Sequence, residues 1–123
     1  MLWASAWTHG GAAALWPWTQ WIRALLARAS SEERARWIAD DAGVLAHIEP
    51  RLGAAAEIGS FAIREAVCAF FSRASADQPL VLVLDDVHAA DLSTLDLLLH
   101  LHSSCGADPI CVCLLYTSDA ADE

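Results

Sequence analysis

The sequence contains no lysine, and all seven of its basic residues are arginine. A phosphate-binding loop of the GxxxxGK[ST] type needs a lysine, so this chain alone cannot supply that group, nor run any mechanism that needs an ammonium. Basic residues are also few against the 16 acidic ones. The resulting net charge of −9 argues against direct contact with nucleic acid and with an anionic membrane surface.

Targeting signals are missing too. Residues 1–22 carry no Arg, Lys, Asp or Glu, but a signal peptide needs positive charge before its apolar stretch, and the first arginine is Arg23. Pro17, Gln20 and two glycines make the same segment poor material for a lipid-facing helix. The four cysteines show no spacing typical of a secreted disulfide framework. We therefore expect a reduced, cytoplasmic protein with no membrane partner.

The chain's 123 residues are enough for one small domain, and 56% of them are apolar, which is enough to form a core. Leu80–Leu84 is a continuous apolar run, typical of a strand buried on both faces of a parallel sheet. Residues 2–7 and a run from Ile110 predict two further strands. Turn and cap residues predict helices from Pro17, from a capping box at Ser30 to near Gly43, from an N-cap at Ser60 to Pro79, and over 92–104 after a cap at Asp91. Strands alternating with helices predict an α/β fold with a parallel sheet.

Helical periodicity predicts which side chains are buried. In the last helix we expect a buried face of leucines: Leu92, Leu95, Leu98 and Leu99. Glu32-Glu33 and Asp40-Asp41 predict a solvated face that pairs with Arg34 and Arg36. Six tryptophans fall before residue 40, where core packing is the main interpretation and an aromatic ligand platform the alternative: Trp3, Trp7, Trp16, Trp18, Trp21 and Trp37.

Two aspartates, Asp85 and Asp86, follow the apolar run directly. Ligands of α/β proteins bind at the carboxyl edge of the parallel sheet, which is where these carboxylates are expected to lie. Two adjacent carboxylates without a counter-ion are costly to bury, so the position favours a cation, most simply Mg²⁺. The alternative is that both residues only cap the following loop.

Three segments carry a resemblance to a known family. LVLVLDDVHAAD, residues 80–91, resembles the Walker B region of P-loop ATPases of the AAA/STAND type. GSFAIREAVCAFFSRASADQP before it is similar to the helix that leads into that strand, and AWTHGGAAALWPWTQWIRALL resembles the segment between Walker A and Walker B. Together they cover residues 1–112. The resemblance is to the origin-recognition-like AAA module of bacterial LuxR-type transcriptional regulators and of adenylate cyclase fusions.

This resemblance implies roles for particular residues. Asp85 matches the Walker B aspartate that holds Mg²⁺, usually through water, and Asp86 matches the acid that orients or deprotonates the attacking water. His88 and Asp91 match trailing positions, for which we infer loop-shaping and helix-capping roles. The implied function is an ATP-binding and ATP-hydrolysing switch domain, with ATP and Mg²⁺ as its ligands, in a transcriptional or signalling regulator.

The sequence departs from the family at both ends. It contains no Walker A loop, so we expect a partial P-loop NTPase sandwich that lacks the Walker A strand and is inactive alone. With the family's sheet order of 5-1-4-3-2, the chain would keep the neighbouring strands 2, 3 and 4. Strand 4 would then expose an edge through which self-association is possible. Residues 113–123 look like a translated transposase sequencing adapter, so we expect residues 1–112 to be the natural domain.

Other classes of function fit the sequence less well. A response-regulator receiver domain needs a lysine and an acidic pair on an earlier strand, and this chain has neither. A metal site would draw on His100, His102, Cys105, Cys111 and Cys113, but His100 and His102 lie two residues apart on a helix and point to different faces. A non-catalytic interaction or scaffold module with a degenerate NTPase fold remains the alternative to an ATPase.

Overall fold

The computed structural model describes residues 1–6, 15–53 and 59–116 of the chain. Its strands are β1 (Leu2–Ser5), β2 (Leu80–Asp85) and β3 (Ile110–Leu114), and they form one parallel sheet in the order β1-β2-β3. The predicted α/β fold with a parallel sheet is confirmed, as is the neighbouring placement of the three strands. β1 ends at Ser5, and the Trp7 end of the predicted strand lies outside the described residues.

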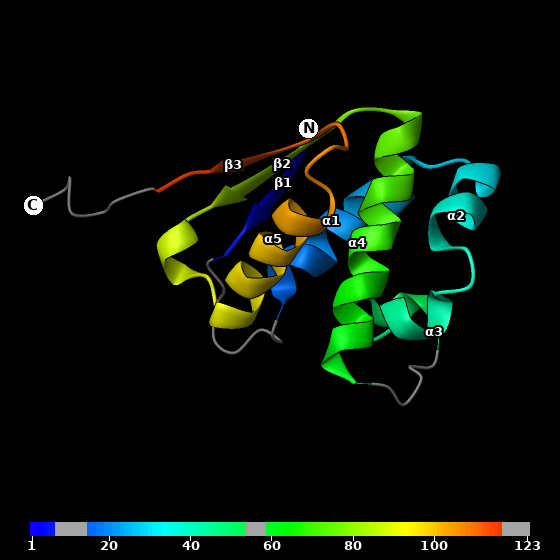
Figure 1. Ribbon diagram of the computed structural model, residues 1–123, viewed down its shortest axis with the longest axis horizontal. Coiled ribbons are helices and arrows are strands. Elements are labelled where there is room, and N and C mark those ends of the chain that lie inside the picture. Colours follow the sequence, from blue (N-terminus) through cyan, green and yellow to red (C-terminus); the bar gives the residue numbers. More distant parts are fainter. Residues whose placement is uncertain (7–14, 54–58, 117–123) are drawn as a thin grey trace, which may run out of the picture.

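The helices lie on one side of this sheet in the view of Figure 1, with α1 and α5 next to the strands and α2 and α3 beyond α4. Their bounds are α1 Trp16–Arg28, α2 Ser31–Ile38, α3 Ala42–Leu45, α4 Ser60–Asp77 and α5 Leu92–Ser104. Two short 3-10 turns, η1 (Pro50–Leu52) and η2 (Val87–Ala89), complete the described elements. Leu80, Leu82 and Leu84 alternate along β2 and are buried together with Leu2 and Ala4 of β1, because β-strand side chains repeat on one face every second residue.

Aromatic side chains form the centre of the core. Trp18 and Trp21 of α1 meet edge to face at 4.9 Å, and Trp18 also packs against Phe71 of α4 at 5.4 Å. Trp18 and Trp21 are completely buried, and each donates its indole N–H to a backbone carbonyl, that of Thr94 and that of Val83 respectively. Trp18, Trp21 and Trp37 therefore serve packing as predicted, whereas Trp3 is 54% exposed. Trp7 lies outside the described residues.

Two helix ends differ from the prediction. The capping box at Ser30 and Glu33 is present, but α2 ends at Ile38 and not near Gly43. Ala39 has a φ of 50°, outside the helical region, so α2 ends there and a separate helix, α3, begins at Ala42. Ser60 is the first residue of α4 and Gly59 takes the N-cap position, without a side-chain cap.

The buried face of α5 was predicted wrongly. Leu92 and Leu99 are 79% and 67% exposed, whereas Thr94, Leu97 and Leu101 are buried along with Leu98. Leucines surround this helix, so two different stripes satisfy helical periodicity. The core selects the stripe with Thr94, whose carbonyl accepts the Trp18 indole N–H.

The predicted solvated face is present, with Glu32 and Asp40 exposed, but the arginines make their direct contacts elsewhere. Glu33 and Glu32 contribute only minor electrostatic interactions that help raise the pKa of Arg36. Arg36 pairs with Asp77 of α4 at 2.9 Å, and Asp41 pairs with Arg73 at 3.1 Å. Arg34 donates to the carbonyl of Leu26. These contacts join α2 and the turn after it to α1 and α4. Tertiary packing brings groups of α1 and α4 closer to these side chains than the exposed acids of α2 lie.

Asp77 makes part of the fold sensitive to acid. The Trp37 indole N–H, at 2.6 Å, and the Arg36 guanidinium lower the pKa of this carboxyl below its usual 3.8. A lowered folded-state pKa adds stability above the usual value, and that stability is lost as the pH falls through the folded pKa. We expect Asp77→Asn to flatten the fall in the free energy of unfolding between about pH 5 and about pH 2, measured by urea denaturation. Asp40→Asn, on the exposed turn after α2, is the control, and an equal flattening there would contradict the assignment.

The β3 edge of the sheet carries no further strand within the described ranges. The carbonyl of Pro109 accepts the N–H of Leu80, and the N–H of Leu115 donates to the carbonyl of Leu84. The peptide groups of the odd-numbered residues from 109 to 115 are therefore the ones that point toward β2. The peptide groups of Val112 and Leu114 therefore face outward, away from β2. Beside them, side chains of α5 and β3 line an apolar groove of about 370 Å³ that includes Leu98, Leu101 and Ile110.

Candidate active site at the carboxyl edge of the sheet

Asp85 is the last residue of β2 and lies next to the end of β1. It is paired in register with Ser5, and its carbonyl accepts the N–H of Ala6 at 2.9 Å. Asp86 follows with a φ of 58° and a ψ of 49°, a left-handed conformation that aspartate tolerates better than most residues. Here the Asp86 N–H donates to Asp85 Oδ1 at 3.0 Å. Both aspartates are half-buried, so the structure brings the predicted pair together at the predicted edge.

Neighbouring segments fix the position of this pair. Val87 N donates to Leu115 O at 3.1 Å, which ties the turn after Asp86 to the end of β3. On the other side, the Gln20 side chain of α1 accepts from Ser5 N and donates to Ser5 O, at 3.2 and 2.9 Å. Sequence reasoning missed Gln20, since a lone polar residue on a largely apolar helix face is the only signal it gives.

His88 and Asp91 follow the pair in the sequence. Asp91 is the N-cap of α5 and accepts hydrogen bonds from the N–H and the hydroxyl of Thr94, so its predicted capping role is confirmed. His88 lies in η2, and its ring is 4.9 Å from that of Tyr116. Since Tyr116 belongs to the adapter-like segment 113–123, this contact does not test the loop-shaping role inferred for His88.

The donor chemistry of the pair fits Mg²⁺. Carboxylate oxygens are hard ligands, and Mg²⁺ in nucleotide sites keeps several waters and takes only one or two carboxylates. Within residues 1–6, 15–53 and 59–116, no three His, Cys, Asp or Glu side chains gather closely enough to hold a metal by themselves. A site at Asp85 would therefore depend on water and on phosphate oxygens for its remaining ligands.

The residues of the alternative metal site are dispersed. Cys105 is buried and donates to the carbonyl of Cys68 at 3.6 Å, and His100 bonds Glu65 at 2.6 Å. Burial raises the pKa of the Cys68 thiol to about 12 and that of Cys105 to about 11. Both are therefore protonated at neutral pH, and neither is a ready metal ligand.

A parallel sheet whose central strand ends in two carboxylates places the protein among the α/β domains that bind ligands at the carboxyl edge of the sheet. The chain belongs to the AAA ATPase domain family, whose family model matches residues 5–113. No curated protein and no solved structure matches it. The fold is accordingly that of a partial P-loop NTPase domain, and the family binds and hydrolyses nucleotide, typically with Mg²⁺. In the described parts of the chain, no helix has the length and apolar character needed to cross a bilayer.

Proposed function

We propose that the protein contributes the Walker B half of a domain that binds MgATP and uses its hydrolysis as a conformational switch. One observation carries the proposal: in a chain of the AAA ATPase domain family, β2 ends at Asp85, and Asp86 follows it at the carboxyl edge of the sheet. In this proposal Asp85 holds Mg²⁺ through water, and Asp86 orients the attacking water or accepts its proton.

The geometry of the pair supports this division of roles. Asp85 uses Oδ1 to accept the N–H of Asp86, which holds its carboxylate at the end of the strand. The left-handed backbone of Asp86 turns the chain immediately after the strand, so the two carboxylates do not follow the alternation of β2. When bound, Mg²⁺ neutralises charge that develops on the phosphate oxygens.

We further propose that residues 1–112 belong to a longer natural protein and that residues 113–123 are not part of it. The second part rests on the adapter-like sequence of residues 113–123. The open edge of β3 supports the first part, because a further parallel strand could bond the outward peptide group of Val112, the last residue of the proposed natural segment. Such a strand would cover the apolar groove between α5 and β3 and carry the phosphate-binding loop and its lysine. Without it, we expect the chain to hydrolyse no ATP and the same edge to allow self-association.

The parent protein is proposed to be a cytoplasmic bacterial regulator of the STAND type, with nucleotide state controlling a transcriptional or signalling output. The net charge of −9 argues that any DNA contact belongs to another domain. A scaffold with a degenerate NTPase fold is the second candidate: an intact phosphate-binding loop upstream in the natural gene favours the ATPase, and a decayed loop favours the scaffold.

Calorimetry with MgATP tests the proposal on two proteins, this chain and a version extended upstream in the natural gene. We expect no measurable heat of binding with the chain alone and saturable, Mg²⁺-dependent binding with the extended protein. An extended protein that has no phosphate-binding loop, or that is folded and binds no MgATP, would overturn the ATPase assignment in favour of the scaffold.

A further inference from the structure

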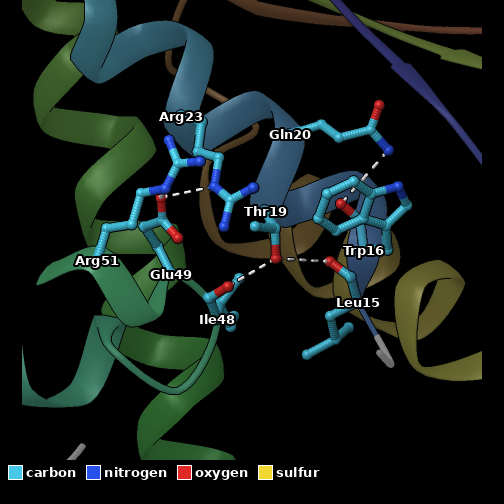
Figure 2. A network of polar contacts seen from close by, with 8 residues as sticks. All are labelled: Leu15, Trp16, Thr19, Gln20, Arg23, Ile48, Glu49 and Arg51. Atoms are coloured by element: carbon cyan, nitrogen blue, oxygen red, sulfur yellow. Dashed lines mark hydrogen bonds and ion pairs between the residues drawn. The ribbon is translucent and has the colours of Figure 1, made fainter. Parts of the chain in front are cut away.

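A single glutamine side chain bonds both outward peptide groups at the carboxyl end of β1. The Ser5 N–H donates to Gln20 Oε1 at 3.2 Å, and Gln20 Nε2 donates to the Ser5 carbonyl at 2.9 Å. The same Nε2 lies 3.5 Å from the Trp16 carbonyl of its own helix (Figure 2). β1 is an outer strand of the sheet that the described residues form, and an outer strand presents peptide groups that need partners. The Gln20 amide therefore takes the place of a neighbouring strand at Ser5.

The part of α1 that carries Gln20 is held in place by its neighbours. The Thr19 hydroxyl donates to the Ile48 carbonyl at 2.6 Å. Arg23 Nε donates to the buried carboxylate of Glu49 at 2.7 Å. Figure 2 shows the Gln20 side chain pointing away from Ile48 and Glu49. These contacts fix the backbone from which the Gln20 amide reaches β1.

Ser5 lies directly beside the first aspartate of the pair. It is the last residue of the four-residue strand β1 and the partner in register of Asp85. The next N–H of the chain, that of Ala6, donates to the Asp85 carbonyl at 2.9 Å. The Asp85 carboxylate in turn accepts the Asp86 N–H at 3.0 Å. The end of β1 therefore holds the backbone from which the Asp85 carboxylate projects.

We propose that Gln20 is a positioning residue for the Asp85 carboxylate and acts through the end of β1. The inference rests on the proposed function, because Asp85 is the carboxylate proposed to hold Mg²⁺. Hydrogen bonds behind a metal-binding group orient that group, and losing one typically lowers metal affinity by about 10–100-fold. A glutamine that only satisfied two polar groups would stabilise the fold and leave Mg²⁺ binding unchanged.

Hydrogen exchange of single N–H groups, measured by NMR on the chain itself, tests the link from Gln20 to Asp85. Gln20→Met keeps a side chain of similar length and removes both bonds to β1. We expect the N–H groups of Ala6 and Asp86 to exchange at least about tenfold faster in this variant, because the end of β1 opens locally. The N–H of Leu80, which bonds the Pro109 carbonyl on the other side of β2, is the internal reference and should change less than about twofold. Unchanged exchange at Ala6 and Asp86, or an equal rise at all three groups, would overturn the proposal.

Calorimetry on the version extended upstream in the natural gene tests the consequence for Mg²⁺. We expect Gln20→Met to raise the Mg²⁺ concentration for half-maximal ATP binding about tenfold, and to change ATP binding in EDTA less than about twofold. Gln78→Met makes the same substitution at an exposed glutamine that ends α4, and is expected to alter neither quantity. Equal losses of ATP binding with and without Mg²⁺, or no change in either, would reduce Gln20 to a structural residue.

The two measurements keep this inference separate from the proposed function. Hydrogen exchange needs no nucleotide, so it decides whether Gln20 holds the end of β1 against Asp85 whatever the extended protein binds. Failure of the unsubstituted extended protein to bind MgATP would overturn the proposed function. Normal binding there, with an unshifted Mg²⁺ dependence in Gln20→Met, would overturn only the role of Gln20. Circular dichroism of each variant verifies folding.

Discussion

Replacing Trp21 by alanine is expected to destabilise the protein by about 3–5 kcal/mol, the usual cost of removing a large buried aromatic side chain. Trp21 is completely buried, meets Trp18 edge to face, and donates its indole N–H to Val83 O at 3.2 Å. The substitution removes apolar burial, leaves a cavity between α1 and β2, and takes a donor from a carbonyl of the central strand. Urea denaturation followed by circular dichroism gives the change in the free energy of unfolding.

Trp3→Ala is the matched control, because it deletes the same side chain from the same half of the sequence. Trp3 is 54% exposed, and its indole N–H bonds only the sulfur of Met1 among the contacts seen. We expect a change of less than about 1 kcal/mol there. Equal losses for the two variants would mean that α1 does not dock on the sheet through Trp21.

The sheet could be predicted because its signals are local and strong. An uninterrupted apolar run such as Leu80–Leu84 fits a central parallel strand, and Pro79 before it and Asp85 after it fix where the strand begins and ends. The caps at Ser30 and Asp91 were readable for the same reason, since each cap bonds a backbone N–H three residues away.

The orientation of α5 could not be predicted in this way. Its apolar residues cover most of the helix circumference, so the sequence pattern allows several buried faces. The choice is made by Trp18, 76 residues earlier, whose indole bonds the carbonyl of Thr94. A contact between positions so far apart leaves no periodic signal in either segment.

The burial of Glu49 was missed for a related reason. Arg23 and Glu49 are 26 residues apart, and the segment around Pro50 shows no helical or strand period. An isolated glutamate in such a segment is normally exposed, so nothing in the sequence indicates a carboxylate with 2% exposure. The aspartate pair, by contrast, was found because its two members are adjacent and end a strand.

In a version of the protein that hydrolyses ATP, Asp86→Asn is expected to lower turnover by about 10²–10³-fold and leave MgATP affinity within a few-fold of the starting protein. Asparagine tolerates the left-handed backbone of Asp86 as well as aspartate does, so the change removes the proton acceptor without disturbing the turn. Asp85→Asn is expected to weaken Mg²⁺-dependent ATP binding, because the charge that favours the cation is lost while the amide oxygen still accepts the Asp86 N–H. Steady-state phosphate release and calorimetry measure the two effects.

Asp96→Asn, on the exposed side of α5, is the charge-matched control and is expected to alter neither quantity. The two variants differ in what they lose: Asp86→Asn loses turnover and keeps MgATP binding, whereas Asp85→Asn loses Mg²⁺-dependent binding first. If both variants reduced binding equally and neither changed turnover at saturating MgATP, the pair would hold the loop and not the chemistry. That result would favour the capping interpretation of Asp85 and Asp86, because a carboxylate that only shapes a turn affects binding through geometry and leaves the bound nucleotide to react at its normal rate.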